Sequence, residues 1–287
     1  MVSPTPEADN EDARNAAEID HPALLEAEQR MQEVLPVPVR VVSATPFAAR
    51  PGVLRGASTL TVKTYLAQQL VFGRPASRGR DAKRGIIGLV GFAGMLTQLF
   101  SGSKLDDPYA DKWLLDIEAA IDAAVAELAD ARRTVAEALA ERVDVQHSIA
   151  QSVKPLQVPL FFSNQFAYRG AYLVNDFDNL VCAIQTTKHV ALFTAEESNA
   201  LIQSSSKTVR RTFASANGYR YTGVSRADIA HGTARAAEAL QRWGELPVGI
   251  LDGSQRAEYG PALPTDSFAH RFAAESAAEA KAAARGD

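Results

Sequence analysis

Apolar and polar side chains alternate along a short stretch near residue 60, and this pattern predicts a strand. Two apolar residues, Leu60 and Val62, occupy alternate positions of residues 58–64. The positions between them and after them carry polar side chains: Thr59, Thr61 and Lys63. A period of two is typical of a strand with one buried face, so we expect the leucine and valine to face the core and the polar set to face outward.

Two helices and a basic loop follow this strand. Residues 65–72 lack glycine and proline and carry apolar residues four positions apart, which predicts a short helix that ends at Gly73. Residues 85–100 carry no charge, and we expect a buried helix there whose glycines, at positions 85, 88, 91 and 94, pack closely against neighbours. A membrane-spanning helix needs about 20 apolar residues, so this segment is too short for one.

The rest of the pattern is mainly helical. Apolar residues recur every three or four positions over residues 108–143, which predicts a long helix with Asp107 as its N-cap and Pro108 in its first turn. Alternation over residues 156–163 predicts a second strand. Thr194 and Glu197 fit a capping box. The shorter predicted elements are helices over about 21–35, 175–193, 194–216 and 225–243 and an edge strand over 36–46.

These elements predict an α+β fold that is mostly α. We expect a disordered acidic tail over residues 1–20, because this segment is rich in Pro, Glu, Asp and Asn without apolar periodicity. Residues 21–262 would form a single helical domain with short strands, and residues 263–287 an alanine-rich charged tail.

Charge is distributed unevenly along the chain. The whole chain has a net charge of −4, but residues 55–85 contain seven basic residues and one acidic residue, a local balance of +6. Such patches are typical of nucleic-acid surfaces, although a solvated loop that only aids solubility would have the same charge. The basic side chains expected to contact phosphates are Arg55, Arg74, Arg78, Arg80, Lys83 and Arg84. A second basic segment, without acidic residues, contains Lys207, Arg210, Arg211, Arg220 and Arg226.

Motifs for other chemistry are missing from the sequence. It contains no phosphate-binding Gly-x-x-x-x-Gly-Lys-Ser/Thr motif, and its five histidines stand singly. The one cysteine, Cys182, lies in an apolar run, so we expect it to be buried rather than nucleophilic. We therefore expect no cofactor, no metal and no enzymatic activity. Without a signal segment or a spanning helix, the predicted location is the cytoplasm, with no membrane partner.

Four blocks of the sequence together resemble a known family. They are STLTVKTYLAQQLVFGRP, GIIGLVGFAGMLTQLFSGSKLDDPYADKWLLDIE, VPLFFSNQFAYRGAYLVNDFDNLVCAIQTTKHVAL and VRRTFASANGYRYTGVSR. The combination resembles integrating conjugative element proteins related to AcaB, the transcriptional activator of conjugative-plasmid transfer genes. The resemblance covers about residues 50–255.

The resemblance implies a DNA-binding regulator that uses a ribbon-helix-helix-like element. In that architecture, one strand from each of two subunits pairs and enters the major groove. Thr59, Thr61 and Lys63 would then read bases. The loop of residues 73–85 is longer than the usual turn between the two helices, and residues 156–163 begin a second strand-helix-helix order, so either strand could be the one that enters DNA.

Two functions remain open at the level of the sequence. The first is a dimeric regulator, in our reading an activator, that binds double-stranded promoter DNA of transfer genes in an integrating conjugative element. The second is a non-enzymatic interaction protein of the transfer or excision apparatus, in which the basic segments bind an acidic protein surface and the helix of residues 108–143 supplies the contact. Further partners under these readings are the transcription machinery and conjugation proteins.

Overall fold

The computed structural model describes residues 56–77, 85–141 and 147–270. Its larger compact unit contains residues 60–158 and 162–270 of this part, while residues 56–59 and 159–161 belong to a second unit. The helix and strand predicted over residues 21–46, the acidic tail and most of the alanine-rich tail lie outside the described residues.

The described chain is mostly helical, as the sequence predicts. Its helices are α2 (Tyr65–Phe72), α3 (Leu89–Lys104), α4 (Pro108–Ala140), α5 (Gln165–His189), α6 (Ala195–Ser215), α7 (Arg226–Ala230), α8 (Ala234–Trp243) and α9 (Val248–Leu251). The two strands, β1 (Ser58–Val62) and β2 (Leu156–Leu160), pair antiparallel in a two-stranded sheet. An α+β fold that is mostly α is therefore confirmed.

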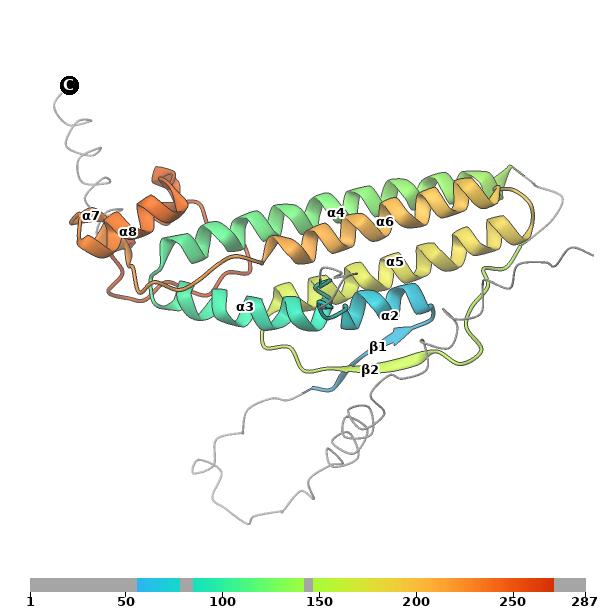
Figure 1. The fold of residues 1–287 in the computed structure, drawn as a ribbon, viewed down its shortest axis with the longest axis horizontal. Coiled ribbons are helices and arrows are strands. Elements are labelled where there is room, and N and C mark those ends of the chain that lie inside the picture. Colours follow the sequence, from blue (N-terminus) through green and yellow to red (C-terminus); the bar gives the residue numbers. More distant parts are fainter. Residues whose placement is uncertain (1–55, 78–84, 142–146, 271–287) are drawn as a thin grey trace, which may run out of the picture. The chain divides into compact units, whose positions relative to one another are not determined.

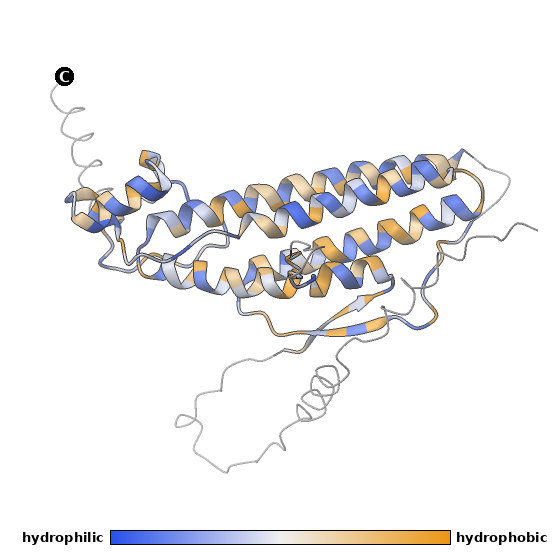
Figure 2. Ribbon diagram, viewed as in Figure 1, coloured by the Kyte–Doolittle hydropathy of each residue, from blue (hydrophilic) through white to orange (hydrophobic). Residues whose placement is uncertain are grey.

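The core of the larger unit lies among its long helices. Helices α4, α5 and α6 pack against one another, and α3 packs against all three (Figure 1). Apolar and polar residues alternate around these helices, so each can turn an apolar face inward (Figure 2). Phe92 of α3 stacks on Phe213 of α6 with ring centroids 4.9 Å apart. Gly170 of α5 faces both rings, and a Cβ there would lie 3.1 Å from Phe92 and 3.3 Å from Phe213, so its small size permits this close packing.

Side-chain caps begin several helices where the sequence predicts them. Asp107 accepts hydrogen bonds from the first backbone N–H groups of α4, and Pro108 follows it. Thr194 and Glu197 form the predicted capping box at α6. Each cap satisfies N–H groups that have no partner within the helix, which fixes the helix start.

Several helix boundaries differ from the prediction. Helix α5 begins at Gln165 rather than near residue 175, because Asn164 caps it and Gly170 is accommodated inside it. The predicted helix of residues 225–243 is divided into α7 and α8, with Gly232 at a φ of 63° between them. Helix α3 begins at Leu89 rather than at residue 85.

A buried ion network attaches the C-terminal segment to the turn between α3 and α4. Arg226, which is 1% exposed, binds Asp106 at 2.9 Å and Asp111 at 2.5 Å, and also donates to the carbonyl of Ile250. Arg256 binds the same Asp111 carboxylate at 3.0 Å. Arg226 was counted in the second basic segment, but its burial removes it from any surface patch.

Candidate nucleic-acid interface

The faces of β1 follow the predicted alternation. Leu60 and Val62 are 7% and 3% exposed, whereas Thr59 is exposed and Thr61 and Lys63 are partly exposed. The two apolar side chains thus hold the strand to the protein, and the three polar residues predicted to read bases lie at the alternate positions. This arrangement is what a base-reading strand requires.

The partner of β1 in the described chain is β2, about a hundred residues further along the sequence. The Thr61 hydroxyl donates to Oε1 of Gln157 at 2.9 Å across the pair. A ribbon-helix-helix protein would instead pair β1 with its copy from another subunit, and that intersubunit pairing stays a prediction. The two candidate strands of the sequence are therefore members of one ribbon, and Gln157 joins Thr61 on its exposed side.

Gln157 was not among the residues that the sequence predicts to read bases. It alternates with the apolar residues Leu156 and Val158, so its outward direction could be predicted from the pattern. Its position opposite Thr61 could not, because the pairing of distant strands is a tertiary property. A glutamine side chain has both a donor and an acceptor and can recognise adenine.

A buried carboxylate of α5 fixes the C-terminal end of β1. Asp178, 1% exposed, accepts from the backbone N–H groups of Lys63 and Thr64 at 2.6 and 2.9 Å and from the Thr64 hydroxyl at 2.6 Å. Thr64 is also the N-cap of α2. The Lys63 ammonium donates to Oδ1 of Asn179 at 2.7 Å, so this side chain is directed toward α5. One carboxylate thus sets the junction between strand and helix.

The ends of the basic loop are held together by a backbone bridge. Arg74 donates to the Ile86 carbonyl at 2.9 Å and accepts from its N–H at 2.7 Å. Gly73, at a φ of 71°, and Gly88 lie so close that a Cβ on either would overlap the backbone of the other segment. Close packing is therefore confirmed at Gly88, whereas a Cβ at Gly94 would meet nothing within 4 Å. Most of the predicted phosphate contacts lie outside the described residues: Arg55, Arg78, Arg80, Lys83 and Arg84.

The second basic segment is divided among several environments. Lys207 and Arg220 are exposed, and Arg210 is half-buried and donates to the Ser206 carbonyl of its own helix. Arg211 binds Glu127 of α4 at 2.6 Å. Hydrogen bonds from Thr208 and Arg211 lower the pKa of Glu127, so this carboxylate stays ionised and partly neutralises the segment. In the part of the chain that the structure describes, no hydrogen bond or ion pair joins this segment to β1.

The long helix α4 already uses much of its charge within the protein. Arg169 of α5 binds Glu118 at 3.6 Å, and Arg132 of α4 binds Asp176 of α5 at 3.0 Å. These pairs lie at the sides of the helix that contact its neighbours. The alternative reading, in which α4 supplies the contact to a partner, would have to use the remaining exposed surface.

The described residues give little support for a metal site, a nucleophilic cysteine or a membrane-spanning helix. No three His, Cys, Asp or Glu side chains gather there as metal ligands would. Cys182 is buried, as predicted, and burial raises the pKa of its thiol. No helix in this part of the chain combines the length and the apolar character that a membrane crossing requires.

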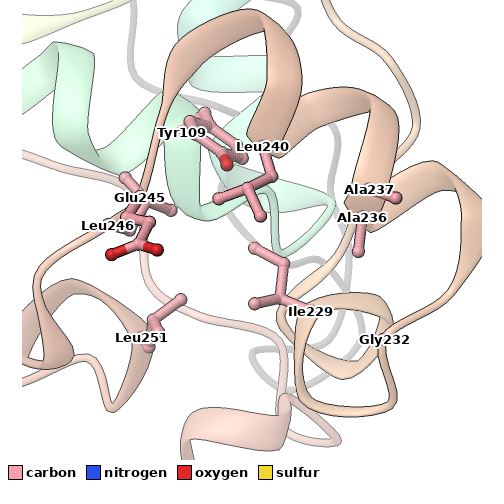
Figure 3. Close-up of a pocket in the computed structure, with 9 residues that line it drawn as sticks. All are labelled: Tyr109, Ile229, Gly232, Ala236, Ala237, Leu240, Glu245, Leu246 and Leu251. Atoms are coloured by element: carbon pink, nitrogen blue, oxygen red, sulfur yellow. The ribbon is translucent and has the colours of Figure 1, made fainter.

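A cavity of about 350 Å³ lies among the C-terminal helices (Figure 3). Ile229, Leu240 and Leu251 line it, and the Tyr109 hydroxyl at its edge donates to the Gly244 carbonyl. Glu245 is its one charged lining residue among those described. No basic side chain that would favour a phosphate lines this cavity among the described residues.

Comparison with known families decides the assignment. The family model described as "Transcriptional regulator AcaB" matches residues 50–264, most of the chain. The chain belongs to the AcaB transcriptional regulator family. The predicted family resemblance is therefore confirmed, and a role in transcription regulation follows from it.

A solved structure is also similar to this AcaB family member. It is the crystal structure of selenomethionine-containing AcaB from uropathogenic E. coli, with 13% sequence identity and a TM-score of 0.48. The similarity covers 68% of this chain and 94% of the other. No protein with a curated description matches the sequence.

Proposed function

We propose that this AcaB family member regulates transcription by binding double-stranded DNA through the β1–β2 ribbon. The observation that carries the proposal is the Thr61–Gln157 pair, which brings a hydroxyl and a carboxamide together on the exposed side of the ribbon. A two-stranded ribbon fits the major groove, where glutamine can bind adenine and a hydroxyl can serve as donor or acceptor. Thr59, exposed on the same strand, completes the proposed reading set.

Lys63 is left out of this reading set. Its ammonium donates to Asn179 on α5, so reaching a base would break that hydrogen bond. Affinity without sequence preference comes instead from the arginines and the lysine predicted to contact phosphates: Arg55, Arg74, Arg78, Arg80, Lys83 and Arg84. The bridge between Arg74 and Ile86 keeps the two described ends of this loop together.

The biological setting of the proposal rests on the family. We place a dimer of the protein at promoters of transfer genes in an integrating conjugative element, where it acts as an activator. Two copies would present two ribbons and so recognise a site with two halves. The transcription machinery and conjugation proteins are the further partners that this role allows.

Binding of the purified full chain to DNA of its own element tests the proposal. Footprinting should show protection of a discrete promoter site that survives an excess of random DNA at two salt concentrations. The same protein should bind random DNA more weakly and lose that binding steeply as salt rises. Absence of binding even at low salt would overturn the proposal and favour the interaction protein, whose basic segments dock on an acidic protein surface.

A further inference from the structure

We infer that a cavity beside the C-terminal end of β1 binds a small amphipathic carboxylate. The cavity measures about 360 Å³ and lies between α4 and α5, and Ile149 and Gln151 contribute to its lining. This volume is in the range of small-molecule sites. The site is separate from the ribbon surface and from the basic loop, so the inference goes beyond DNA binding.

The walls of the cavity determine the chemistry of the ligand. Most of the lining is apolar, and Val135, Leu139 and Ile149 contribute to it. Lys63 and Arg132 add two cations, while no carboxylate lines the cavity among the described residues. Apolar walls with a cationic end favour a ligand that has a hydrocarbon part and one negative group.

Lys63 supplies the positive charge of this site. Its ammonium has three N–H donors, and its hydrogen bond in the structure goes to a neutral amide, Oδ1 of Asn179 at 2.7 Å. Arg132, by contrast, is already paired with Asp176 at 3.0 Å. A carboxylate at the Lys63 end would give the ammonium a charged acceptor, which is a stronger partner than the amide.

Inorganic phosphate has the negative charge but no hydrocarbon to place against the walls. An alcohol of the same length has the hydrocarbon but no charge. Octanoate combines both features. Octanol therefore tests the contribution of the hydrocarbon alone, and inorganic phosphate tests the contribution of the negative charge alone.

The position of Cys182 gives a direct readout of occupancy. It lines the cavity, is 6% exposed and is the chain's one cysteine, so thiol alkylation of the protein reports on this position. Burial raises the pKa of the thiol, which makes its reaction with iodoacetamide slow and easy to follow by intact mass. A ligand in the cavity shields the sulfur and slows the reaction.

The experiment measures Cys182 alkylation in the full chain without DNA. Octanoate should slow the reaction with a saturable dependence on concentration, and octanol and inorganic phosphate should need at least about tenfold higher concentrations. Lys63→Met keeps the stem and the backbone bonds to Asp178 but removes the charge, and it should weaken octanoate at least about tenfold. Lys112→Met, roughly 30 Å away along α4, should leave octanoate protection unchanged.

Three results would overturn the inference or its assignment of the charge to Lys63. Equal protection by octanol and octanoate would show that charge does not select the ligand, and this comparison needs no variant. An unchanged affinity of Lys63→Met for octanoate would show that the Lys63 ammonium does not bind the carboxylate. Absence of protection by octanoate at any concentration below its micelle-forming range would exclude the site.

Occupancy should also change the affinity for DNA, because Lys63 directly follows β1 and Asp178 holds its backbone. This link rests on the proposed function. Octanoate should alter DNA binding of the wild-type protein by at least about threefold and leave that of Lys63→Met unchanged. Protection of Cys182 without any change in DNA affinity would support the ligand site but contradict its coupling to DNA binding. Protection of Cys182 in a protein that binds no DNA would show that only the proposed function fails.

Discussion

Asp178 is the residue on which the junction between β1 and α2 depends. Replacement by alanine removes three hydrogen bonds to one charged acceptor and leaves the N–H groups of Lys63 and Thr64 without a partner. Losses of this kind are large because buried donors are costly to leave unpaired. We expect Asp178→Ala to lower the free energy of unfolding by about 3 kcal/mol in urea denaturation.

Asp176 provides the matched control on the same helix. Its carboxylate pairs with Arg132 at a partly exposed position, where ion pairs contribute little. Asp176→Ala should therefore cost less than about 1 kcal/mol. Equal losses from the two variants would mean that Asp178 does not have the structural role described above.

Two glycines of α3 predict opposite effects of the same substitution. A Cβ at Gly102 would overlap the hydroxyl of Tyr219, which donates to the buried Asp107 at 2.8 Å, so we expect Gly102→Ala to destabilise by roughly 2 kcal/mol. At Gly94 a Cβ would meet nothing, and Gly94→Ala should stabilise the helix by up to about 1 kcal/mol. Thermal unfolding of the pair checks this, and a shift in the same direction for both would contradict it.

At the scale of elements, several signals that lie within one segment were predicted correctly. Helix α2 has the predicted bounds, and α4 and α6 begin at the predicted caps Asp107 and Thr194. Caps and apolar periodicity act over a few residues, so the sequence contains all the information that they need. The buried face of β1 is predictable for the same reason.

Features that depend on distant segments were not predictable. The Thr61–Gln157 pair needs the pairing of two strands far apart in the sequence, and Arg226 resembles a surface cation until Asp106 and Asp111 surround it. The early start of α5 depends on the small volume that Gly170 leaves for the aromatic rings of other helices. Each of these outcomes is decided by tertiary packing, which overrides local preference.

The start of α4 predicts a pH dependence of stability. Burial raises the pKa of Asp107 above its ordinary 3.8, although hydrogen bonds from Tyr219 and the helix N–H groups lower it in part. A group whose pKa is raised on folding stabilises the folded state most at pH values below its pKa in the unfolded chain. This contribution is lost as the pH rises through its pKa in the folded protein. Asp107→Asn keeps an N-cap side chain but does not titrate.

Urea denaturation across the range from about pH 4 to pH 7 measures this difference. Relative to the wild-type protein, Asp107→Asn should gain stability as the pH rises. A relative loss over the same range would mean that the pKa of Asp107 is lowered on folding.

At the scale of the whole molecule, the contrast between a net charge of −4 and a local balance of +6 sets the expected salt dependence. Each phosphate contact contributes about −0.9 to the slope of log K against log salt. Replacing Arg78 and Arg80 together by glutamine should therefore make the slope less steep by about 2 and weaken specific and random DNA alike. Titrations at several salt concentrations measure the slope, and an unchanged slope would remove these residues from the interface.

The measurement that tests the central claim most directly compares Thr61→Ala and Gln157→Ala with the wild-type protein on the protected promoter site and on random DNA. If the ribbon reads bases, each variant should lose about 1 to 3 kcal/mol on the specific site and little on random DNA. Unfolding curves of the variants verify that both remain folded. Equal losses on the two DNAs, or no loss on either, would contradict base reading by the β1–β2 ribbon.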